Sequence, residues 1–129
     1  MQKIAATLFL LILFSTAGSA QEQENSFPNI KQYFFVMLTR GPNASTIDSL
    51  DLQKIQEGHL ANIHRMADTG KLKIAGPFGD DGNWRGIFIF DVNSEEEVKE
   101  LIKNDPAIQS GRLSYEIHPW WTEKGACLD

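Results

Sequence analysis

The sequence predicts an α+β fold in which strands and helices follow one another in the order βαββαβ. Four segments are rich in β-branched and aromatic residues, which is typical of strands. Two segments carry apolar residues at the spacing of an amphipathic helix. The second and third strands flank a loop rich in glycine and proline, which favours an antiparallel hairpin. Together these features indicate the ferredoxin-like fold, a four-stranded antiparallel sheet with two helices on one face.

The first half of this pattern has clear boundaries. A first strand is predicted over Gln32–Arg40 and is stopped by a Gly-Pro-Asn turn. Asp48 is a suitable N-cap for a helix that runs to about Thr69. Gly70 follows it and suits the left-handed backbone at a helix end. A short second strand is predicted over Lys71–Ala75.

The second half repeats the arrangement. The turn-forming loop over residues 76–83 leads into a third strand over Trp84–Val92. Ser94 and Glu97 form a capping-box pattern that opens the second helix, and the proline at position 106 limits that helix. The fourth strand is predicted over Gly111–His118 and ends at the Pro-Trp-Trp sequence.

Both faces of the central strands are apolar. Along Tyr33–Leu38 and along Trp84–Phe90, large hydrophobic side chains occupy both alternating sets of positions. Two helices cover only one side of such a sheet, so the other side needs a partner. We therefore expect a homodimer packed sheet to sheet.

The first twenty residues have the composition of a cleavable secretory signal. Lys3 gives a positive start, Ile4–Phe14 is an apolar run too short to span a bilayer, and small residues precede Gln21. No other segment is long enough to cross a membrane. We expect an exported protein, periplasmic or secreted, with a signal peptide at residues 1–20, a polar leader at 21–31 and a C-terminal tail at 122–129.

Composition narrows the classes of partner. Removal of residues 1–20 leaves 11 basic and 17 acidic residues, because Lys3 is the one charged residue of that segment. The resulting net charge of −6, without a basic cluster, disfavours nucleic acid and anionic membranes. The single cysteine, Cys127, cannot form an internal disulfide and is interpreted as a tolerated thiol in the tail.

One ionisable residue interrupts the apolar stripe of the first helix. The stripe consists of residues spaced by three or four positions: Leu52, Ile55, His59, Ile63 and Met66. In the second helix-like segment, Val98, Leu101 and Ile102 lead at the same spacing to Asp105. Spacing alone therefore predicts a histidine and a carboxylate on the inward faces of the two helices.

Such a pair can carry acid–base chemistry. The carboxylate of Asp105 would hold one tautomer of His59 and stabilise its cation, while the other ring nitrogen takes or gives a proton. Structural alternatives stay open for both residues. His59 could simply bond a backbone carbonyl, and Asp105 could cap the Asp-Pro turn. In the last turn of a helix, its carboxylate would also face the negative end of the helix dipole.

Other chemistry is poorly supported by the sequence. No serine or cysteine lies in a nucleophile motif. His64 lies about 140° around the helix from His59 and is predicted at the surface, while His118 ends the last strand, so no metal or cofactor is expected. Trp84, Trp120 and Trp121 are interpreted as core or dimer contacts, although one could line a pocket.

Several short motifs, in this order and spacing, resemble the YCII-related proteins of the dimeric α+β barrel superfamily. They are Gly58-His59-Leu60, Gly70-Lys71-Leu72, Ala75-Gly76-Pro77-Phe78, Ser94-Glu95-Glu96, Asn104-Asp105-Pro106 and Pro119-Trp120. The resemblance implies a domain over residues 32–121, a homodimer, and His59 and Asp105 as the active-site dyad. Ala107 stands where the family commonly has an aromatic residue.

The resemblance also implies a reaction class. It favours a lyase or isomerase acting on a small enolic or phenolic molecule through the His59 and Asp105 pair. The rival interpretation is a non-catalytic binding or structural module in which the same pair holds a helix onto the sheet. An open cleft that reaches His59 would favour the enzyme, and a dyad sealed from water would favour the rival.

Overall fold

A computed structural model describes residues 29–126. Within this range the chain forms β1 (Ile30–Arg40), α1 (Ser49–Asp68), β2 (Leu72–Pro77), β3 (Trp84–Phe90), α2 (Glu95–Ile102), α3 (Pro106–Gln109) and β4 (Leu113–Glu123). The strands form an antiparallel sheet in the order β2-β3-β1-β4. The predicted ferredoxin-like fold is confirmed, with one short helix, α3, that the sequence pattern did not predict.

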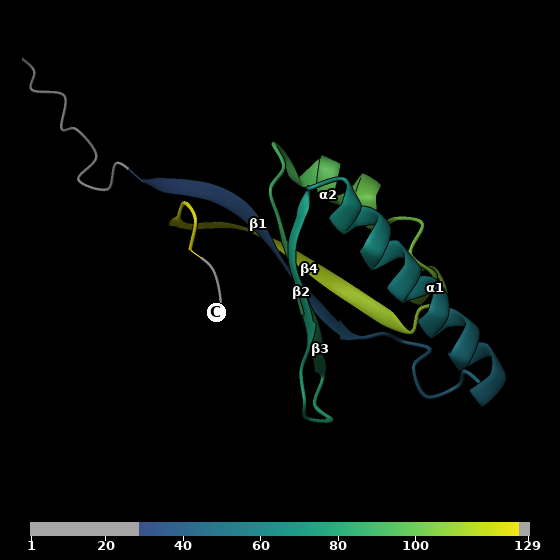
Figure 1. The fold of residues 1–129 in the computed structure, drawn as a ribbon. Coiled ribbons are helices and arrows are strands. Elements are labelled where there is room, and N and C mark those ends of the chain that lie inside the picture. Colours follow the sequence, from purple (N-terminus) through teal and green to yellow (C-terminus); the bar gives the residue numbers. More distant parts are fainter. Residues whose placement is uncertain (1–28, 127–129) are drawn as a thin grey trace, which may run out of the picture.

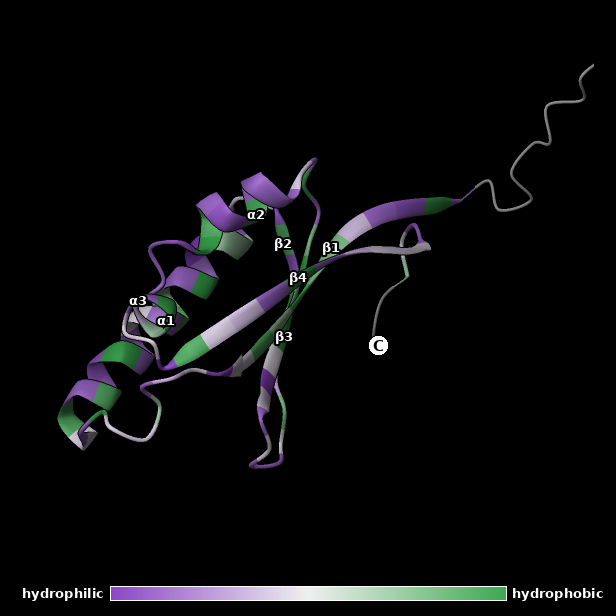
Figure 2. Ribbon diagram, turned by 180° about the vertical axis from the view of Figure 1, so that it is seen from behind, coloured by the Kyte–Doolittle hydropathy of each residue, from purple (hydrophilic) through white to green (hydrophobic). Residues whose placement is uncertain are grey.

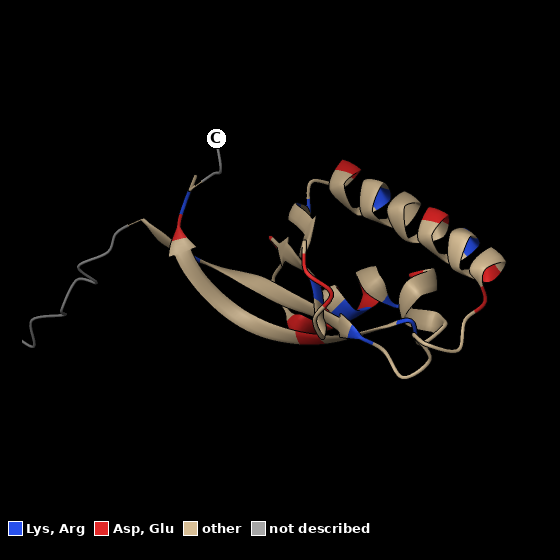
Figure 3. Ribbon diagram, turned by 90° about the horizontal axis from the view of Figure 1, so that it is seen from below, with Lys and Arg blue, Asp and Glu red and all other residues tan. Residues whose placement is uncertain are grey.

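The molecule has two layers. The helices lie on one side of the sheet, and the other side carries no helix within the described residues (Figures 1 and 3). Strands β1 and β4 are paired along their whole length, from Ile30 opposite Glu123 to Arg40 opposite Leu113. The start of β1 and the end of β4 extend together beyond the helices (Figures 1 and 2).

Local capping explains where the helices begin. The Asp48 carboxylate accepts hydrogen bonds from the backbone N–H groups of Leu50 and Asp51, both at 3.0 Å, and so starts α1. Gly70, with φ of 74°, follows its end in the left-handed region. The Ser94 hydroxyl accepts from the Glu97 N–H at 3.2 Å and starts α2, as the capping-box pattern predicted.

The second helix ends earlier than expected. Helix α2 stops at Ile102, and Asp105 is the N-cap of α3 rather than a residue in the last turn of α2. Pro106 explains the break, because the ring of a proline is tolerated in a first turn and disfavours α geometry in the residue before it. The predicted conflict between the Asp105 carboxylate and a helix C-terminus therefore does not arise.

Strand β4 is longer than predicted and runs through Pro119 to Glu123. Proline lacks a backbone N–H, but β4 lies at the edge of the sheet, where one side of the strand needs no partner. Strand β1 likewise begins two residues before the predicted start.

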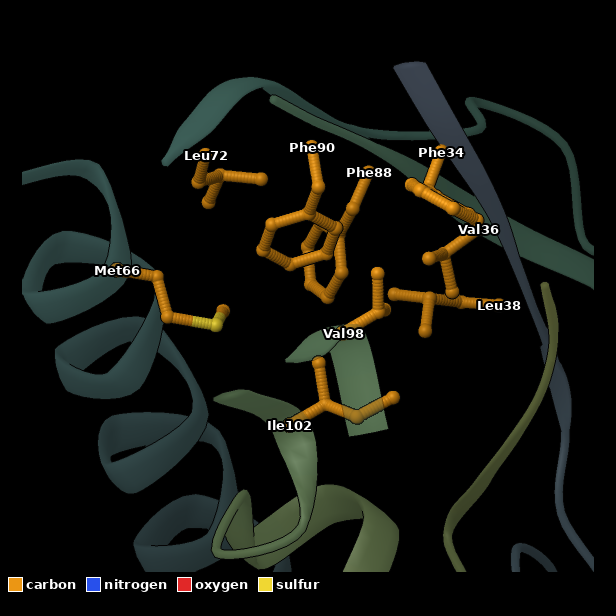
Figure 4. Packing of buried hydrophobic residues seen from close by; sticks show 9 residues of the cluster. All are labelled: Phe34, Val36, Leu38, Met66, Leu72, Phe88, Phe90, Val98 and Ile102. Carbon is orange, nitrogen blue, oxygen red and sulfur yellow. The ribbon is translucent and has the colours of Figure 1, made fainter. Parts of the chain in front are cut away.

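The core lies between the helices and the sheet (Figure 4). It is built from large apolar side chains of both layers: Phe34, Val36, Leu38, Met66, Leu72, Phe88, Phe90, Val98 and Ile102. Figure 2 shows hydrophobic and hydrophilic residues alternating along the helices, as amphipathic packing on one side requires. The helix-facing set of β1 is thus Phe34, Val36 and Leu38.

The opposite face is apolar as well. Phe35 pairs with Ile89 and Met37 pairs with Ile87 on that face. The register shifts between Leu38 and Thr39, which puts Trp84 opposite Thr39 rather than on the face of Phe88 and Phe90. Strict alternation along Trp84–Phe90 predicts that Trp84 shares a face with Phe88 and Phe90. This prediction is wrong, because the bulge interrupts the alternation.

Some predictions lie outside the described residues. They are the signal peptide at residues 1–20, most of the leader, and Cys127. Among residues 29–126, no helix has the length and apolar character needed to cross a membrane.

Candidate active site

His59 is held by a buried carboxylate. Its position in the apolar stripe of α1 turns the ring toward the sheet, and only 8% of the residue is exposed. The ring nitrogen Nδ1 lies 2.9 Å from Oδ1 and 2.9 Å from Oδ2 of Asp105. Since an ionised carboxylate only accepts hydrogen bonds, Nδ1 carries the proton and donates it. The structure thus brings together the two residues that the spacing placed on inward faces.

Asp105 has hydrogen-bond donors on several sides. It is 1% exposed, and besides His59 it accepts from the Asn62 side-chain amide at 2.9 Å and from the Ala107 backbone N–H at 2.9 Å. The bond from Ala107 caps α3, so the same carboxylate makes the local turn and the contact with His59.

Burial and hydrogen bonding act in opposite directions on Asp105. Burial alone raises the pKa of the carboxyl group. The hydrogen bonds from His59 and Asn62, the positive charge that His59 can carry, and the bond from Ala107 together outweigh burial and leave the pKa below its ordinary value. Asp105 is therefore an anion at neutral pH, as a residue that orients a histidine must be.

Asn62 is a buried residue of the site that sequence reasoning missed. Its Oδ1 accepts from Nε and a terminal nitrogen of Arg65, at 3.2 and 2.7 Å. The same guanidinium donates to the Leu101 carbonyl at 3.1 Å. This arrangement directs the amide nitrogen of Asn62 at Asp105. Its spacing of three residues from His59 was a usable signal, since such residues share a helix face.

A close approach between two helices makes the pair possible. A Cβ atom built on Gly58 would lie 2.7 Å from Cγ of Pro106, closer than two carbon atoms can approach without a shift. Glycine at position 58 therefore lets α1 contact the segment that carries Asp105. Ala107, the residue that follows Pro106, is fully buried.

His59 also borders a cavity of about 320 Å³ between α1 and the sheet. Its walls come from β1, α1, β2, β3 and the start of β4: Leu38, Gln56, His59, Leu60, Ile63, His64, Ala75, Gly76, Pro77, Arg85, Gly86, Phe88, Arg112 and Leu113. Asp105 itself does not line the cavity. Because Nδ1 is occupied by Asp105, Nε2 is the ring nitrogen that stays available to a molecule in the cavity.

The remaining candidate residues lie apart from the His59 and Asp105 pair. His64 is exposed, as predicted, and lies at the rim of the cavity. His118 is exposed on β4 at 3.6 Å from Glu116. Trp84, Trp120 and Trp121 are exposed and do not line the cavity, and in residues 29–126 no cluster of three potential metal ligands occurs.

Two cavity residues had no signal in the sequence pattern. Arg85 and Arg112 both line the cavity. Arg85 lies in β3 at the bulge opposite β1, and Arg112 directly precedes β4. Their role depends on tertiary position, which hydrophobic periodicity does not report.

Comparison with known families identifies the family of this domain. The family model described as the YCII-related domain matches residues 33–121. The chain belongs to the YCII-related family. The matched segment begins in β1 and ends in β4.

Among curated proteins, this YCII-related protein is similar to the uncharacterized protein YjpA of Bacillus subtilis (strain 168). The two are 31% identical over 67 residues, which are 52% of this chain and 76% of YjpA. The similarity supports the family and carries no activity with it.

Two solved structures share the fold. The 5-chloro-2-hydroxyhydroquinone dehydrochlorinase of Burkholderia phenoliruptrix AC1100, in complex with 2,5-dihydroxybenzoquinone, has a TM-score of 0.53 and 19% identity, over 68% of this chain and 92% of its own. Muconolactone isomerase has a TM-score of 0.56 and 13% identity, over 75% of this chain and 96% of its own. Identities this low establish the fold alone.

Proposed function

We propose that this YCII-related protein binds a small enolic or phenolic molecule and moves a proton on it with His59, as a lyase or an isomerase. The observation that carries the proposal is the two-sided environment of His59. One edge of the ring is fixed by the buried carboxylate of Asp105, and the ring borders a cavity of about 320 Å³.

The proposed division of labour follows from these contacts. Asp105 keeps the proton on Nδ1, so Nε2 is a base in the neutral ring. When Nε2 accepts a proton from an enolic or phenolic hydroxyl, or from a carbon next to a carbonyl, the nearby carboxylate stabilises the imidazolium. Return of that proton at another atom completes an isomerisation, and loss of a leaving group completes an elimination.

The fold relatives give this proposal its substrate class. One is a dehydrochlorinase of a hydroxylated hydroquinone, and the other is an isomerase of a lactone. The apolar wall of the cavity, including Phe88 and Ile63, suits a flat ring of that size.

The test is a binding and turnover screen. Hydroxylated aromatic compounds and enol lactones, including the substrates that these two relatives are named for, are added to the protein and followed by NMR. We expect binders to shift the resonances of the His59 ring, and His59→Gln to remove turnover of any substrate. Binders that leave the His59 ring unaffected would argue against the proposal.

A second candidate function is a non-catalytic binding or structural module. It is favoured by the fact that Asp105 also caps α3 and accepts from Asn62, contacts that would stabilise the fold without any reaction. Under this alternative, ligands bind the cavity unchanged, and His59→Gln alters stability more than any rate.

We further propose that the protein is exported and acts as a homodimer packed sheet to sheet. The apolar set on the helix-free face supports the dimer, and the amino-acid pattern of residues 1–20 supports export.

A further inference from the structure

The cavity next to His59 differs in charge from the rest of the protein. The whole chain has a net charge of −5, yet the ionisable residues that line the cavity are all basic: His59, His64, Arg85 and Arg112. We propose that Arg112 and Arg85 form a binding site for the carboxylate of an organic acid. The inference rests on the proposed function, because it places the enolic or phenolic part of the same acid against His59.

Arg112 is a half-buried cation without a carboxylate partner. One terminal nitrogen donates to Oε1 of Gln56 at 2.6 Å, and Gln56 is neutral. Among residues 29–126, no acidic oxygen lies within 4.0 Å of this guanidinium, since every described ion pair involves other residues. A partly buried arginine is ordinarily paired, so the remaining donors suit an anion from outside.

Arg85 is directed to the cavity by an irregularity of β3. The ladder with β1 pairs Leu38 with Gly86 and Thr39 with Trp84, which leaves Arg85 without a partner in that ladder. Such a bulge re-aims a side chain. The guanidinium donates to the Gly82 carbonyl at 3.2 Å and approaches the Asp81 carboxylate at 3.3 Å.

The counter-charge of Arg85 is weak. The Asp81 side chain is 93% exposed, and it also pairs with Arg40 at 2.8 Å. Solvent and salt screen an exposed, shared carboxylate of this kind. Positive charge in the cavity is therefore poorly compensated by the protein itself.

The two arginines affect each other. Burial lowers the pKa of Arg112, and the positive charge of Arg85 lowers it further. An anion bound beside both guanidinium groups would relieve this repulsion. A carboxylate also matches the planar fork of an arginine, which binds it through two parallel hydrogen bonds.

The position of the site fits an acid with a ring. Gln56, which holds Arg112, precedes His59 by three residues and lies on the same face of α1. Along the helix axis this spacing is about 4.5 Å. A carboxylate near Arg112 and a hydroxyl near His59 can therefore belong to one small molecule, with apolar walls between them.

Three matched ligands test the inference: phenol, benzoate and 4-hydroxybenzoate. Their dissociation constants are measured by NMR titration on the purified protein, at low and at high salt. We expect 4-hydroxybenzoate to bind about tenfold or more tightly than phenol, because a charged hydrogen-bonded pair contributes this much. High salt should reduce that advantage.

Variants assign the effect to the two arginines. Arg112→Gln and Arg85→Gln should each remove most of the carboxylate advantage while the affinity for phenol stays the same, which also shows that the variants are folded. Lys103→Gln removes an exposed positive charge on another surface and is the control. It should leave all three affinities unchanged.

The outcomes separate the two proposals. Equal binding of phenol and 4-hydroxybenzoate, failure of both acids to bind at millimolar concentration, or an advantage that survives both arginine variants would overturn the carboxylate site. In another outcome, benzoate binding depends on Arg112, but benzoate and 4-hydroxybenzoate bind equally well and His59→Gln changes neither affinity. The carboxylate site then stands and the proposed function fails.

Discussion

At the scale of single residues, Asp105 connects α1 with α3. It receives bonds from His59 and Asn62 of α1 and from the backbone of Ala107 in α3. Asn62 is in turn oriented by Arg65. These linked hydrogen bonds hold the His59 ring in one orientation, as a group that transfers protons requires.

If His59 and Asp105 act as one unit, their contributions to catalysis are not additive. With a substrate in hand, His59→Ala, Asp105→Asn and the double variant should each lower the rate by a factor on the order of 10² to 10⁴. The double variant should be little worse than the worse single variant. Turnover numbers measured at saturating substrate check this. Fully multiplicative losses would mean that the two residues act independently.

Asp105 should also make stability depend on pH. Its pKa is lowered in the folded protein, so the carboxylate stabilises the fold above its ordinary pKa of 3.8, and this stabilisation is lost as pH falls toward the lower, folded-state value. Denaturant unfolding at a series of acidic pH values should therefore show a steeper loss of stability in wild type than in Asp105→Asn. Parallel curves would contradict this assignment.

At the scale of elements, the contact between α1 and α3 decides whether the pair can form. Gly58 and Pro106 touch at the point where the helices meet. This contact sets how far α1 lies from the N-cap residue of α3.

Gly58→Ala tests that contact. Alanine ordinarily stabilises a helix relative to glycine, but here its Cβ would overlap the rigid proline ring. We expect a net loss of stability of about 1 kcal/mol or more, measured by denaturant unfolding. Adding Pro106→Ala removes the overlapping Cγ, so the double variant should be more stable than the sum of the single effects. Additive effects would mean that the contact is not strained by the added methyl group.

At the scale of the whole molecule, the helix-free face of the sheet is the main unexplained surface. It carries Phe35, Met37 and Ile87, and Trp120 beside it is 41% exposed. A soluble monomer seldom leaves such an apolar surface uncovered.

Sedimentation of the protein at micromolar concentration should give about twice the monomer mass. Phe35→Glu introduces a charge into this face and should give a folded monomer, as judged by circular dichroism. Leu50→Glu, at a residue that is 72% exposed on α1, is the matched control and should stay dimeric. A wild-type monomer would contradict the sheet-to-sheet dimer.

The export proposal concerns the whole chain as well. Mass analysis of the protein recovered from its cell should find an N-terminus at Gln21, outside the cytoplasm, since a short apolar run followed by small residues is a cleavage pattern. Recovery of intact Met1 from the membrane would mean that the segment is an anchor.

The sequence by itself determined the order of the four strands and the two longer helices, the caps of α1 and α2, and the inward direction of His59. Each of these depends on contacts a few residues apart, which periodicity and capping motifs report directly. The same local reasoning misplaced Asp105, because it extended the helix pattern of α2 through a residue that precedes a proline.

Only the tertiary structure decided what surrounds His59. Its contact with Asp105 joins residues 46 positions apart, and the bond between Gln56 and Arg112 joins residues 56 positions apart. The bulge that frees Arg85 depends on the register of β1 against β3. Spacing along one element defines which residues share a face. The residues that this face contacts depend on how closely separate elements approach each other. At Gly58, the absence of a Cβ atom decides how closely α1 approaches α3.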